Sequence, residues 1–337
     1  MFKIVDDEKR IEDAQHKFIK KFEPFIDKKI SVNVGHRGDS QKKEVSWSSK
    51  LGIWMLLSKE KAENRYWNAF GIGEPSKGAN VSIICEINFP SRGIDRSIGG
   101  AFVTDSSGSL IVVHRGKIGG GRKGIGKSLF EDNYRGEWIA IDENGVETKV
   151  ALVGAMDSPR FVRQVSQFVF EVKRIKDLIY APAREQQRAI EFREEFEGEK
   201  VYISEKDKIV AKCDHGSIVN ALDSDLERRG FKVGNNKQCD LFVVNAKGEK
   251  VSLFEIKTDI SSTSIYCGVG QLLLNGVGIS TRPKLILTIP KKVNKTLEAK
   301  LNKLGIELLL FRWRGDKVVF PKLDSFVRKL KRLQNIS

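Results

Sequence analysis

The segment 239–257, CDLFVVNAKGEKVSLFEIK, constrains the fold more than any other part of the chain, because its turn fixes how two strands pair. Lys247–Gly248 favours a tight turn between two apolar runs. Since strand side chains alternate with period two, such a turn brings Asp240, Glu255 and Lys257 to one face, at the end of the hairpin far from the turn. The pairs expected on that face are Val244 with Val251, Phe242 with Leu253, and Asp240 with Glu255. The sequence therefore predicts a β-hairpin that presents two carboxylates and an ammonium group together.

Helical and β-like runs alternate on both sides of this hairpin. Their order is helix, three-stranded meander, helix, strand, helix and strand, which predicts an α/β domain with a mixed sheet over residues 201–337. The serines of 261–264 are placed to cap the second helix. The expected helices cover about 216–229, 265–275 and 293–304, and the expected strands cover about 231–233, 240–244, 251–257, 285–289 and 306–311.

The far end of the hairpin has a composition that favours chemistry over structure. Two adjacent carboxylates on a buried sheet face repel each other and are costly to desolvate. A divalent cation relieves this repulsion, and Mg²⁺, with Mn²⁺ as an alternative, binds one or two carboxylates, waters and a substrate phosphate. Lys257 is then placed to orient or deprotonate an attacking water, or to offset charge in the transition state. The structural alternative is an exposed hairpin end with a surface ion pair.

With Asp240, Glu255 and Lys257 in this order, residues 213–311 resemble the PD-(D/E)XK nuclease superfamily, which has the restriction-endonuclease-like fold. The resemblance implies that Asp240 and Glu255 bind the metal and that Lys257 acts in catalysis. Cys239 stands where the family's motif has its proline, a position that often varies.

The resemblance implies further residues on the two core helices. Many members of the family add an acidic metal ligand on the first core helix, for which Glu227 and Asp223 are the candidates. Gln271, on the second core helix, resembles a glutamine that several branches direct at the active site. His215 comes directly before the first helix, where it lies either beside the metal and the scissile phosphate or at a helix start with a local hydrogen bond.

The cysteines indicate a reducing environment. The four cysteines are scattered and form no Cys-x-x-Cys pair, so a secreted disulfide scaffold is disfavoured and a cytoplasmic protein is expected. The spacing of Cys213, His215, Cys239 and Cys267 matches no standard zinc pattern, and small buried thiols are expected instead. No apolar run approaches the roughly 20 residues that span a bilayer, and MFKIVDDEKR carries acids where a signal peptide needs an apolar core, so no membrane partner is expected.

The chain is strongly basic, with 59 Lys and Arg against 44 Asp and Glu and a net charge of +15 over 337 residues. Thirteen Lys and Arg lie in 291–337, against four acids. A second basic stretch, 106–130, contains no acid at all. Two separate clusters favour a polyphosphate partner, here DNA. The candidate nucleic-acid-binding residues of the second stretch are Arg115, Lys117, Arg122, Lys123 and Lys127.

Gly121–Ser128 spells the phosphate-binding motif G-x-x-x-x-G-K-[ST] letter for letter. Such a loop should leave a strand at once and open a long helix. Here the expected strand 110–114 ends seven residues earlier, and the following helical run lasts about two turns before Arg135–Gly136. A mobile basic loop that approaches nucleic-acid phosphates is therefore favoured over nucleotide hydrolysis.

Residues 1–160 have the texture of a β-rich (α+β) domain with a helical lead-in over the first thirty residues. Several short strands suggest a curved sheet or small barrel. Residues 161–200 return to helical spacing and are expected to form a helical connector to the second domain. The expected strands are 81–87, 100–104, 110–114, 137–141 and 148–154, and the aromatics that are candidates for the core or for stacking on a base are Trp47, Trp54, Tyr66, Trp67 and Phe70.

These observations favour a Mg²⁺-dependent DNA endonuclease of the restriction or defence type, with an amino-terminal domain that selects the target. The layout resembles that of modification-dependent restriction enzymes. A homodimer is expected, because double-strand cleavage commonly requires two active sites. The alternatives are an inactive nuclease fold that binds DNA or acts as a sensor, a nucleotide-dependent enzyme that uses Gly121–Ser128, and RNA in place of DNA as the substrate.

Overall fold

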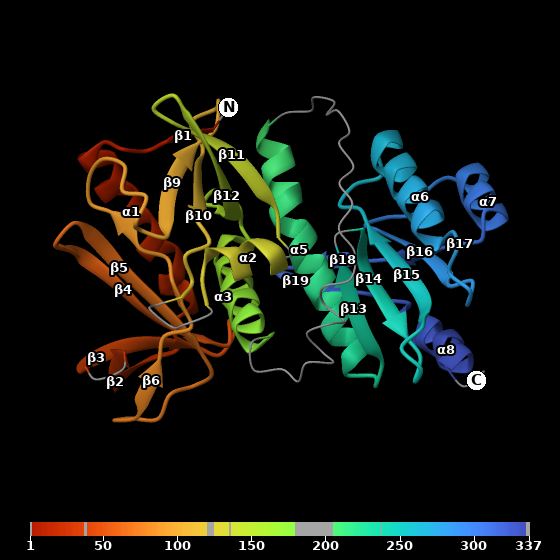
Figure 1. The fold of residues 1–337 in the computed structure, drawn as a ribbon, viewed down its shortest axis with the longest axis horizontal. Coiled ribbons are helices and arrows are strands. Elements are labelled where there is room, and N and C mark those ends of the chain that lie inside the picture. Colours follow the sequence, from red (N-terminus) through yellow and green to blue (C-terminus); the bar gives the residue numbers. More distant parts are fainter. Residues whose placement is uncertain are drawn as a thin grey trace. The chain divides into compact units, whose positions relative to one another are not determined.

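The computed structural model describes residues 2–36, 39–119, 125–134, 136–178, 205–236 and 238–334. The chain divides into two compact units, Met1–Cys213 and Asp214–Ser337, which we call the amino-terminal and the carboxyl-terminal unit (Figure 1).

A closed five-stranded barrel forms one half of the amino-terminal unit. Its first strand runs parallel to β11 and antiparallel to β9, and this double pairing closes the barrel. Apolar side chains such as Val103, Ile111 and Ile141 fill its core. The barrel follows the sequence-based suggestion, but β1 lies in the segment that was expected to be helical. The strands, in barrel order, are β1 (Phe2–Ile4), β11 (Trp138–Glu143), β12 (Val146–Ala155), β10 (Leu110–His114) and β9 (Gly100–Thr104).

A seven-stranded sheet forms the other half of this unit. Its four long strands lie between residues 28 and 72, where no individual strand was expected, and antiparallel pairing joins them in chain order. Trp47, Trp54, Tyr66 and Phe70 are buried in this unit, so these four aromatics belong to its core. The strands are β2 (Lys28–His36), β3 (Asp39–Ser48), β4 (Ile53–Ala62), β5 (Arg65–Ile72), β6 (Asn80–Ser82), β7 (Cys85–Glu86) and β8 (Phe89–Pro90).

Two amphipathic helices, α1 (Glu8–Phe22) and α3 (Phe161–Asp177), complete the core of the amino-terminal unit. Phe18 of α1 contacts the ring of Phe161 of α3 with centroids 5.8 Å apart. The apolar side of α3 is buried in the same core, so this helix is part of the unit and not the connector that the sequence suggested. The second half of the expected connector lies outside the described residues. A short 3-10 turn, η1 (Glu23–Phe25), follows α1, and a short helix, α2 (Lys127–Asn133), precedes β11.

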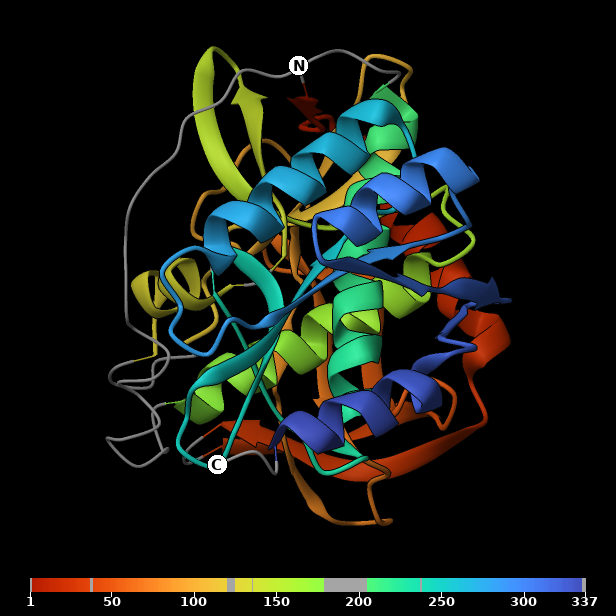
Figure 2. The same ribbon diagram turned by 90° about the vertical axis from the view of Figure 1, so that its right-hand side faces the viewer.

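A five-stranded mixed sheet with helices on both faces forms the carboxyl-terminal unit, as the sequence indicated (Figure 2). The first three strands are antiparallel and the last three are parallel. One face packs against α5 and α8, and the other packs against α6 and α7. The strands in order are β13 (Lys232–Asn236), β14 (Cys239–Val244), β15 (Lys250–Ile256), β16 (Lys284–Ile289) and β17 (Ile306–Leu310). The helices are α5 (Glu205–Glu227), α6 (Ser262–Gly276), α7 (Lys295–Lys303) and α8 (Leu323–Gln334). A small separate hairpin is formed by β18 (Arg312–Arg314) and β19 (Lys317–Val319).

The hairpin β14–β15 has the expected register over most of its length. Leu241 pairs with Phe254 and Phe242 with Leu253, but a bulge next to the turn pairs Val244 with Lys250. The expected pair of Val244 with Val251 is therefore wrong. The turn explains the shift, because Gly248 has φ +85° and Asn245 bonds to Glu249 across a three-residue loop.

Candidate active site

The two carboxylates predicted from the hairpin lie on adjacent strands of the carboxyl-terminal sheet. Leu241 pairs with Phe254, so Asp240 and Glu255 are the next residues along β14 and β15. Glu255 is only 2 % exposed. The side chain of Asp240 is 20 % exposed. The strand register thus places one buried carboxylate beside another that solvent still reaches.

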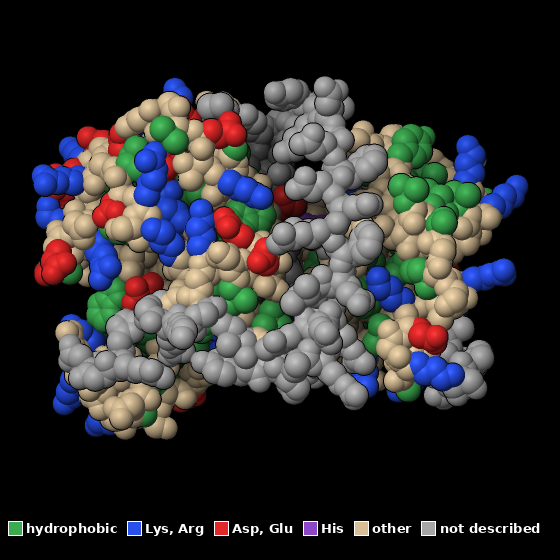
Figure 3. All heavy atoms as spheres, in the orientation of Figure 1, with side chains coloured by type: hydrophobic (Ala, Val, Ile, Leu, Met, Phe, Trp, Pro, Cys, Tyr) green, Lys and Arg blue, Asp and Glu red, His purple; other side chains and the backbone are tan. Residues whose placement is uncertain are grey.

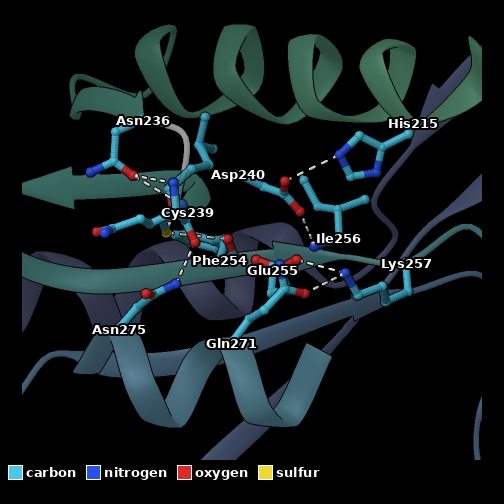
Figure 4. A network of polar contacts seen from close by, with 12 residues as sticks. His215, Asn236, Cys239, Asp240, Phe254, Glu255, Ile256, Lys257, Gln271 and Asn275 are labelled. Atoms are coloured by element: carbon cyan, nitrogen blue, oxygen red, sulfur yellow. Dashed lines mark hydrogen bonds and ion pairs between the residues drawn. The ribbon is translucent and has the colours of Figure 1, made fainter. Parts of the chain in front are cut away.

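Lys257 follows β15 directly and turns back toward Glu255. Its Nζ donates to Glu255 Oε1 at 2.6 Å and to Gln271 Oε1 at 2.8 Å (Figure 4). The backbone amide of Lys257 donates to the carbonyl of Thr288 on β16 at 2.9 Å, which holds the residue against the sheet. The structure therefore brings together the Glu-x-Lys pair of β15 and the glutamine of α6.

Asp240 is held in place by donors on its other side. Its Oδ2 accepts a hydrogen bond from the backbone amide of Ile256 at 2.7 Å, and its Oδ1 lies 3.2 Å from His215 Nε2 (Figure 4). His215 comes from α5, whereas Gln271 comes from α6 on the opposite face of the sheet. Both helix layers thus contribute one polar side chain to the end of the hairpin.

The electrostatics of the two carboxylates differ. Burial, and then the charge of Asp240, raise the pKa of Glu255 to about 7. Burial also acts to raise the pKa of Asp240, but the hydrogen bond and charge of His215 and the amide of Ile256 outweigh it and lower that pKa. Ionising Glu255 beside the ionised Asp240 is therefore unfavourable, and a bound cation would favour the ionised form of both acids.

The oxygen donors of the site are of the kind that Mg²⁺ binds. Among the residues that the structure describes, no three His, Cys, Asp or Glu side chains are grouped to form an all-protein metal cage. Mg²⁺ requires no such cage, since one or two carboxylates, several waters and a substrate phosphate complete its octahedron. Asp240 and Glu255 are two such oxygen donors on adjacent strands.

The acidic candidates of the first core helix are not brought into this group. The helix starts at Glu205 instead of near Gly216, so His215 lies within it and is not a residue before its start. Glu227 is exposed at the end of the helix, about 18 Å along the axis from His215. Asp223 lies about 12 Å along the axis from His215. The helix position that faces Asp240 is therefore occupied by a histidine.

Two features that shape the site were missed from the sequence. Asn236 Oδ1 accepts from the amides of Gln238 and Cys239, at 3.1 and 2.9 Å, and so shapes the connection into β14. Asp259 accepts from the Ser261 amide at 2.7 Å and from Ser264 Oγ at 2.9 Å, which fixes the loop between Lys257 and α6. Both features could have been predicted from the sequence, since Asn and Asp side chains commonly bond to backbone amides two residues ahead.

The basic stretch of the amino-terminal unit is only partly available to a ligand. Arg115 is not a surface residue, because its side chain is 5 % exposed and its Nη2 lies 2.6 Å from Glu143 Oε1. Its predicted contact with nucleic acid is therefore replaced by a buried ion pair. Lys117 and Lys127 are exposed, and Lys127 Nζ lies 3.4 Å from Glu131. Arg122 and Lys123 lie outside the described residues.

The Gly121–Ser128 motif does not have the geometry of a nucleotide-binding loop in its described part. The preceding strand, β10, is antiparallel to both of its neighbours and ends at His114. The helix α2 does begin at Lys127, after Gly126, but it is only seven residues long. Residues 120–124 of the loop lie outside the described part of the chain.

The cysteines and aromatics have mostly structural roles. Cys85 and Cys239 are buried and free, and burial raises the pKa of each thiol to about 12. Cys267, expected to be buried, is exposed on α6, and the side chain of Cys213 lies outside the described residues. Trp67 is half-buried and donates to Glu86 Oε1 at 3.1 Å.

Comparison of the chain with protein-family models, with curated proteins and with solved structures finds no match. Within the described residues, none of the helices combines the length and the apolar character needed to cross a membrane.

Proposed function

We propose that the protein is a Mg²⁺-dependent endonuclease that hydrolyses phosphodiester bonds in DNA, of the restriction or defence type. The observation that carries this proposal is the grouping of Asp240, Glu255 and Lys257 at one end of a buried hairpin. Burial and the charge of Asp240 disfavour the ionised form of Glu255, and a divalent cation would relieve this cost, so the group suits a cation and a phosphate substrate more than it suits a structural role.

The charge of the same unit supports a polyanionic substrate. Exposed lysines and arginines lie on and around α7, the β18–β19 hairpin and α8. Figure 3 shows several of these basic side chains near α7. Such residues neutralise phosphates and so give affinity for nucleic acid without sequence preference. This affinity falls steeply as the salt concentration rises. The exposed basic residues are Lys291, Lys292, Lys295, Lys300, Lys303, Arg312, Arg314, Lys317, Lys322, Arg328, Lys329 and Lys331.

In this proposal each side chain of the site has a role. Asp240 and Glu255 would hold Mg²⁺, which when bound polarises a phosphate oxygen and acidifies a coordinated water. An ammonium has three N–H groups, and the bonds of Lys257 to Glu255 and Gln271 use two of them. The third remains to donate to the attacking water or to a phosphate oxygen, where it offsets negative charge in the transition state. Gln271 orients Lys257, and His215 orients Asp240.

The central experiment measures plasmid cleavage with Mg²⁺, with Mn²⁺ and with EDTA. Lys257→Met should lower the cleavage rate by about a hundredfold to a thousandfold, because it removes one charged donor from the transition state. DNA affinity, measured by fluorescence anisotropy without metal, should change little. Asp240→Asn should abolish cleavage in the presence of Mg²⁺.

The matched control is Lys247→Met, which removes an exposed lysine from the turn of the same hairpin and should leave cleavage unchanged. Cleavage by Lys257→Met at a near-normal rate would show that the site is wrongly assigned. A wild-type protein that binds DNA but never cuts it would instead support the inactive, DNA-binding alternative.

The amino-terminal unit, in this proposal, selects the target. Lys117 and Lys127 are its exposed basic residues near the glycine-rich loop, and they would contact the DNA backbone. Cleavage of unmodified, methylated and hydroxymethylated DNA by the full chain tests this role. Cutting of all three substrates at equal rates would contradict modification-dependent selection.

A further inference from the structure

The outer face of α6 is the most exposed apolar surface on the described part of the chain. Tyr266 is 69 % exposed, Leu274 is 74 % exposed and Val277, which follows the helix, is 77 % exposed. Every other large hydrophobic side chain in the described residues is less exposed than these three. Figure 3 shows the corresponding green patch at the place of α6.

These side chains form one continuous stripe. At 100° per residue, Tyr266, Gly270, Leu274 and Val277 fall within an arc of roughly 80°. The opposite side of α6, with Ile265, Gly268 and Leu272, is buried against the sheet. The helix is thus apolar on both sides, whereas a surface helix normally presents a polar face to water. A second apolar face of this kind marks an interaction site.

The stripe is free of charge in a strongly basic protein. The helix, STSIYCGVGQLLLNG, contains no charged residue. The neighbouring helix α7, KTLEAKLNK, carries three lysines, and the whole chain has a net charge of +15. Two copies of this chain repel each other over most of their surface, and α6 is a place where they can approach without opposing lysines.

We propose that a second copy of the chain docks on this stripe, with α6 packed antiparallel against α6 around a two-fold axis. Such an interface uses the same patch on both copies, so the patch must be complementary to itself. Centring the pair on Gly270 places Tyr266 of each copy opposite Leu274 of the other, since both lie four residues from the glycine. A Cβ on Gly270 would meet nothing within 4 Å, so the gap is open for a second helix backbone.

The docking would link the active sites of the two copies. Gln271 lies next to Gly270 in α6 and contacts Lys257, so a pair of α6 helices brings each copy's site close to the same interface. The purpose, cutting both strands of a duplex, rests on the proposed function, whereas the association itself does not. One helix of 15 residues buries less than the ~800 Å² per partner of a stable interface, so association in the micromolar range is expected.

Sedimentation velocity of the full chain over the micromolar range, without DNA or metal, tests the association. We expect a monomer–dimer equilibrium that Leu274→Lys weakens about tenfold or more, because it removes apolar contact and brings two like charges together. Val146→Lys is the matched control, since Val146 is 50 % exposed in the amino-terminal unit, and it should leave the equilibrium unchanged. Circular dichroism shows whether each variant is folded.

The exposed Cys267 reports whether α6 itself lies in the interface. A short bismaleimide should cross-link two wild-type copies, and the product should be lost in Cys267→Ser and reduced in Leu274→Lys. A monomer throughout the concentration range would overturn the proposal, and so would a dimer that resists Leu274→Lys and lacks the Cys267 cross-link. Lys257→Met should dimerise normally, so a failure of the nuclease assignment is distinguishable from a failure of this one.

Discussion

Each unit buries a glutamate, and the two are neutralised in different ways. In the amino-terminal unit, Glu143 accepts from Arg96 Nε at 2.7 Å and from Thr148 Oγ1 at 2.9 Å. Arg115 Nη2 lies 2.6 Å from its other oxygen. Burial acts to raise the pKa of Glu143, but these donors outweigh it and lower that pKa. This carboxylate stays ionised and has cationic partners on both oxygens.

In the carboxyl-terminal unit, Glu255 has one cationic partner, Lys257, and a second carboxylate, Asp240, beside it. Its pKa is raised to about 7, first by burial and then by Asp240. The comparison teaches that burial alone does not identify a functional acid. A buried carboxylate enclosed by cations is a structural element, whereas one that lies beside a second carboxylate and has a raised pKa is prepared for a ligand that brings positive charge.

The largest effect is expected from removing Glu143, which neutralises Arg96 and Arg115. Glu143→Ala should lower the free energy of unfolding of the amino-terminal unit by about 3–5 kcal/mol, because it leaves buried Arg115 without its counter-ion. Hydrogen exchange measured by mass spectrometry follows β10, β11 and β12 separately from the other unit. Glu131→Ala, which removes a partly exposed pair with Lys127, is the control and should change stability by less than ~1 kcal/mol. Equal effects of the two variants would contradict the structural role of the cluster.

A smaller effect, of opposite sign in the two units, is expected from pH. Burial lowers the pKa of His114 from 6.5 to about 4, so the unfolded chain takes up its proton first, and the amino-terminal unit should lose up to about 3 kcal/mol as pH falls from 6.5 to 4. The raised pKa of Glu255 acts the other way. The folded, metal-free protein keeps that proton from pH 4.5 to 7, so the carboxyl-terminal unit should lose stability as pH rises through this window. Hydrogen exchange at several pH values, in EDTA, should show the two opposite slopes, and parallel slopes would contradict the assignment.

The smallest effect is expected from removing the repulsion between Glu255 and Asp240. In EDTA at pH 8, Glu255→Gln should stabilise the carboxyl-terminal unit by about 1 kcal/mol, because it removes the repulsion with Asp240 while keeping the shape of the side chain. Added Mg²⁺ should stabilise the wild type and leave Glu255→Gln unaffected. Thermal unfolding monitored with and without Mg²⁺ measures both, with the exposed Glu249→Gln of the hairpin turn as the control. A loss of stability in Glu255→Gln would show that its ion pair with Lys257 outweighs the repulsion.

The sequence was sufficient for the features that depend on local rules. The turn at Lys247–Gly248 and the alternation of side chains placed Asp240, Glu255 and Lys257 together, since strand pairing follows from turn position. The cap of α6 was also predicted, and Ser261 accepts from the Ser264 amide as expected. Strands β9 and β10 have the expected bounds because each is a short apolar run between polar turns.

Features that depend on distant parts of the chain were missed. The start of α5, EKDKIVAKCD, is too polar to show an apolar stripe, so the helix was begun late and His215 was misplaced. The long strands β2 (KKISVNVGH) and β3 (DSQKKEVSWS) contain few apolar residues among many polar ones and gave weak β signals. Arg115 shows its charge in the sequence, but its burial depends on Glu143, which the barrel brings close. The burial of α3 likewise depends on the core that receives it.

The way the barrel closes sets an order of events during synthesis. Phe2 and Lys3 pair with Ile141 and Asp142, so during synthesis β1 waits for about 140 further residues before its second neighbour, β11, exists. Until then the first strand has an unsatisfied edge, and closing so long a loop is slow. At translation speeds of roughly 5–20 residues per second this interval lasts on the order of ten seconds. During this interval β1 is the strand of the barrel that most needs chaperone protection.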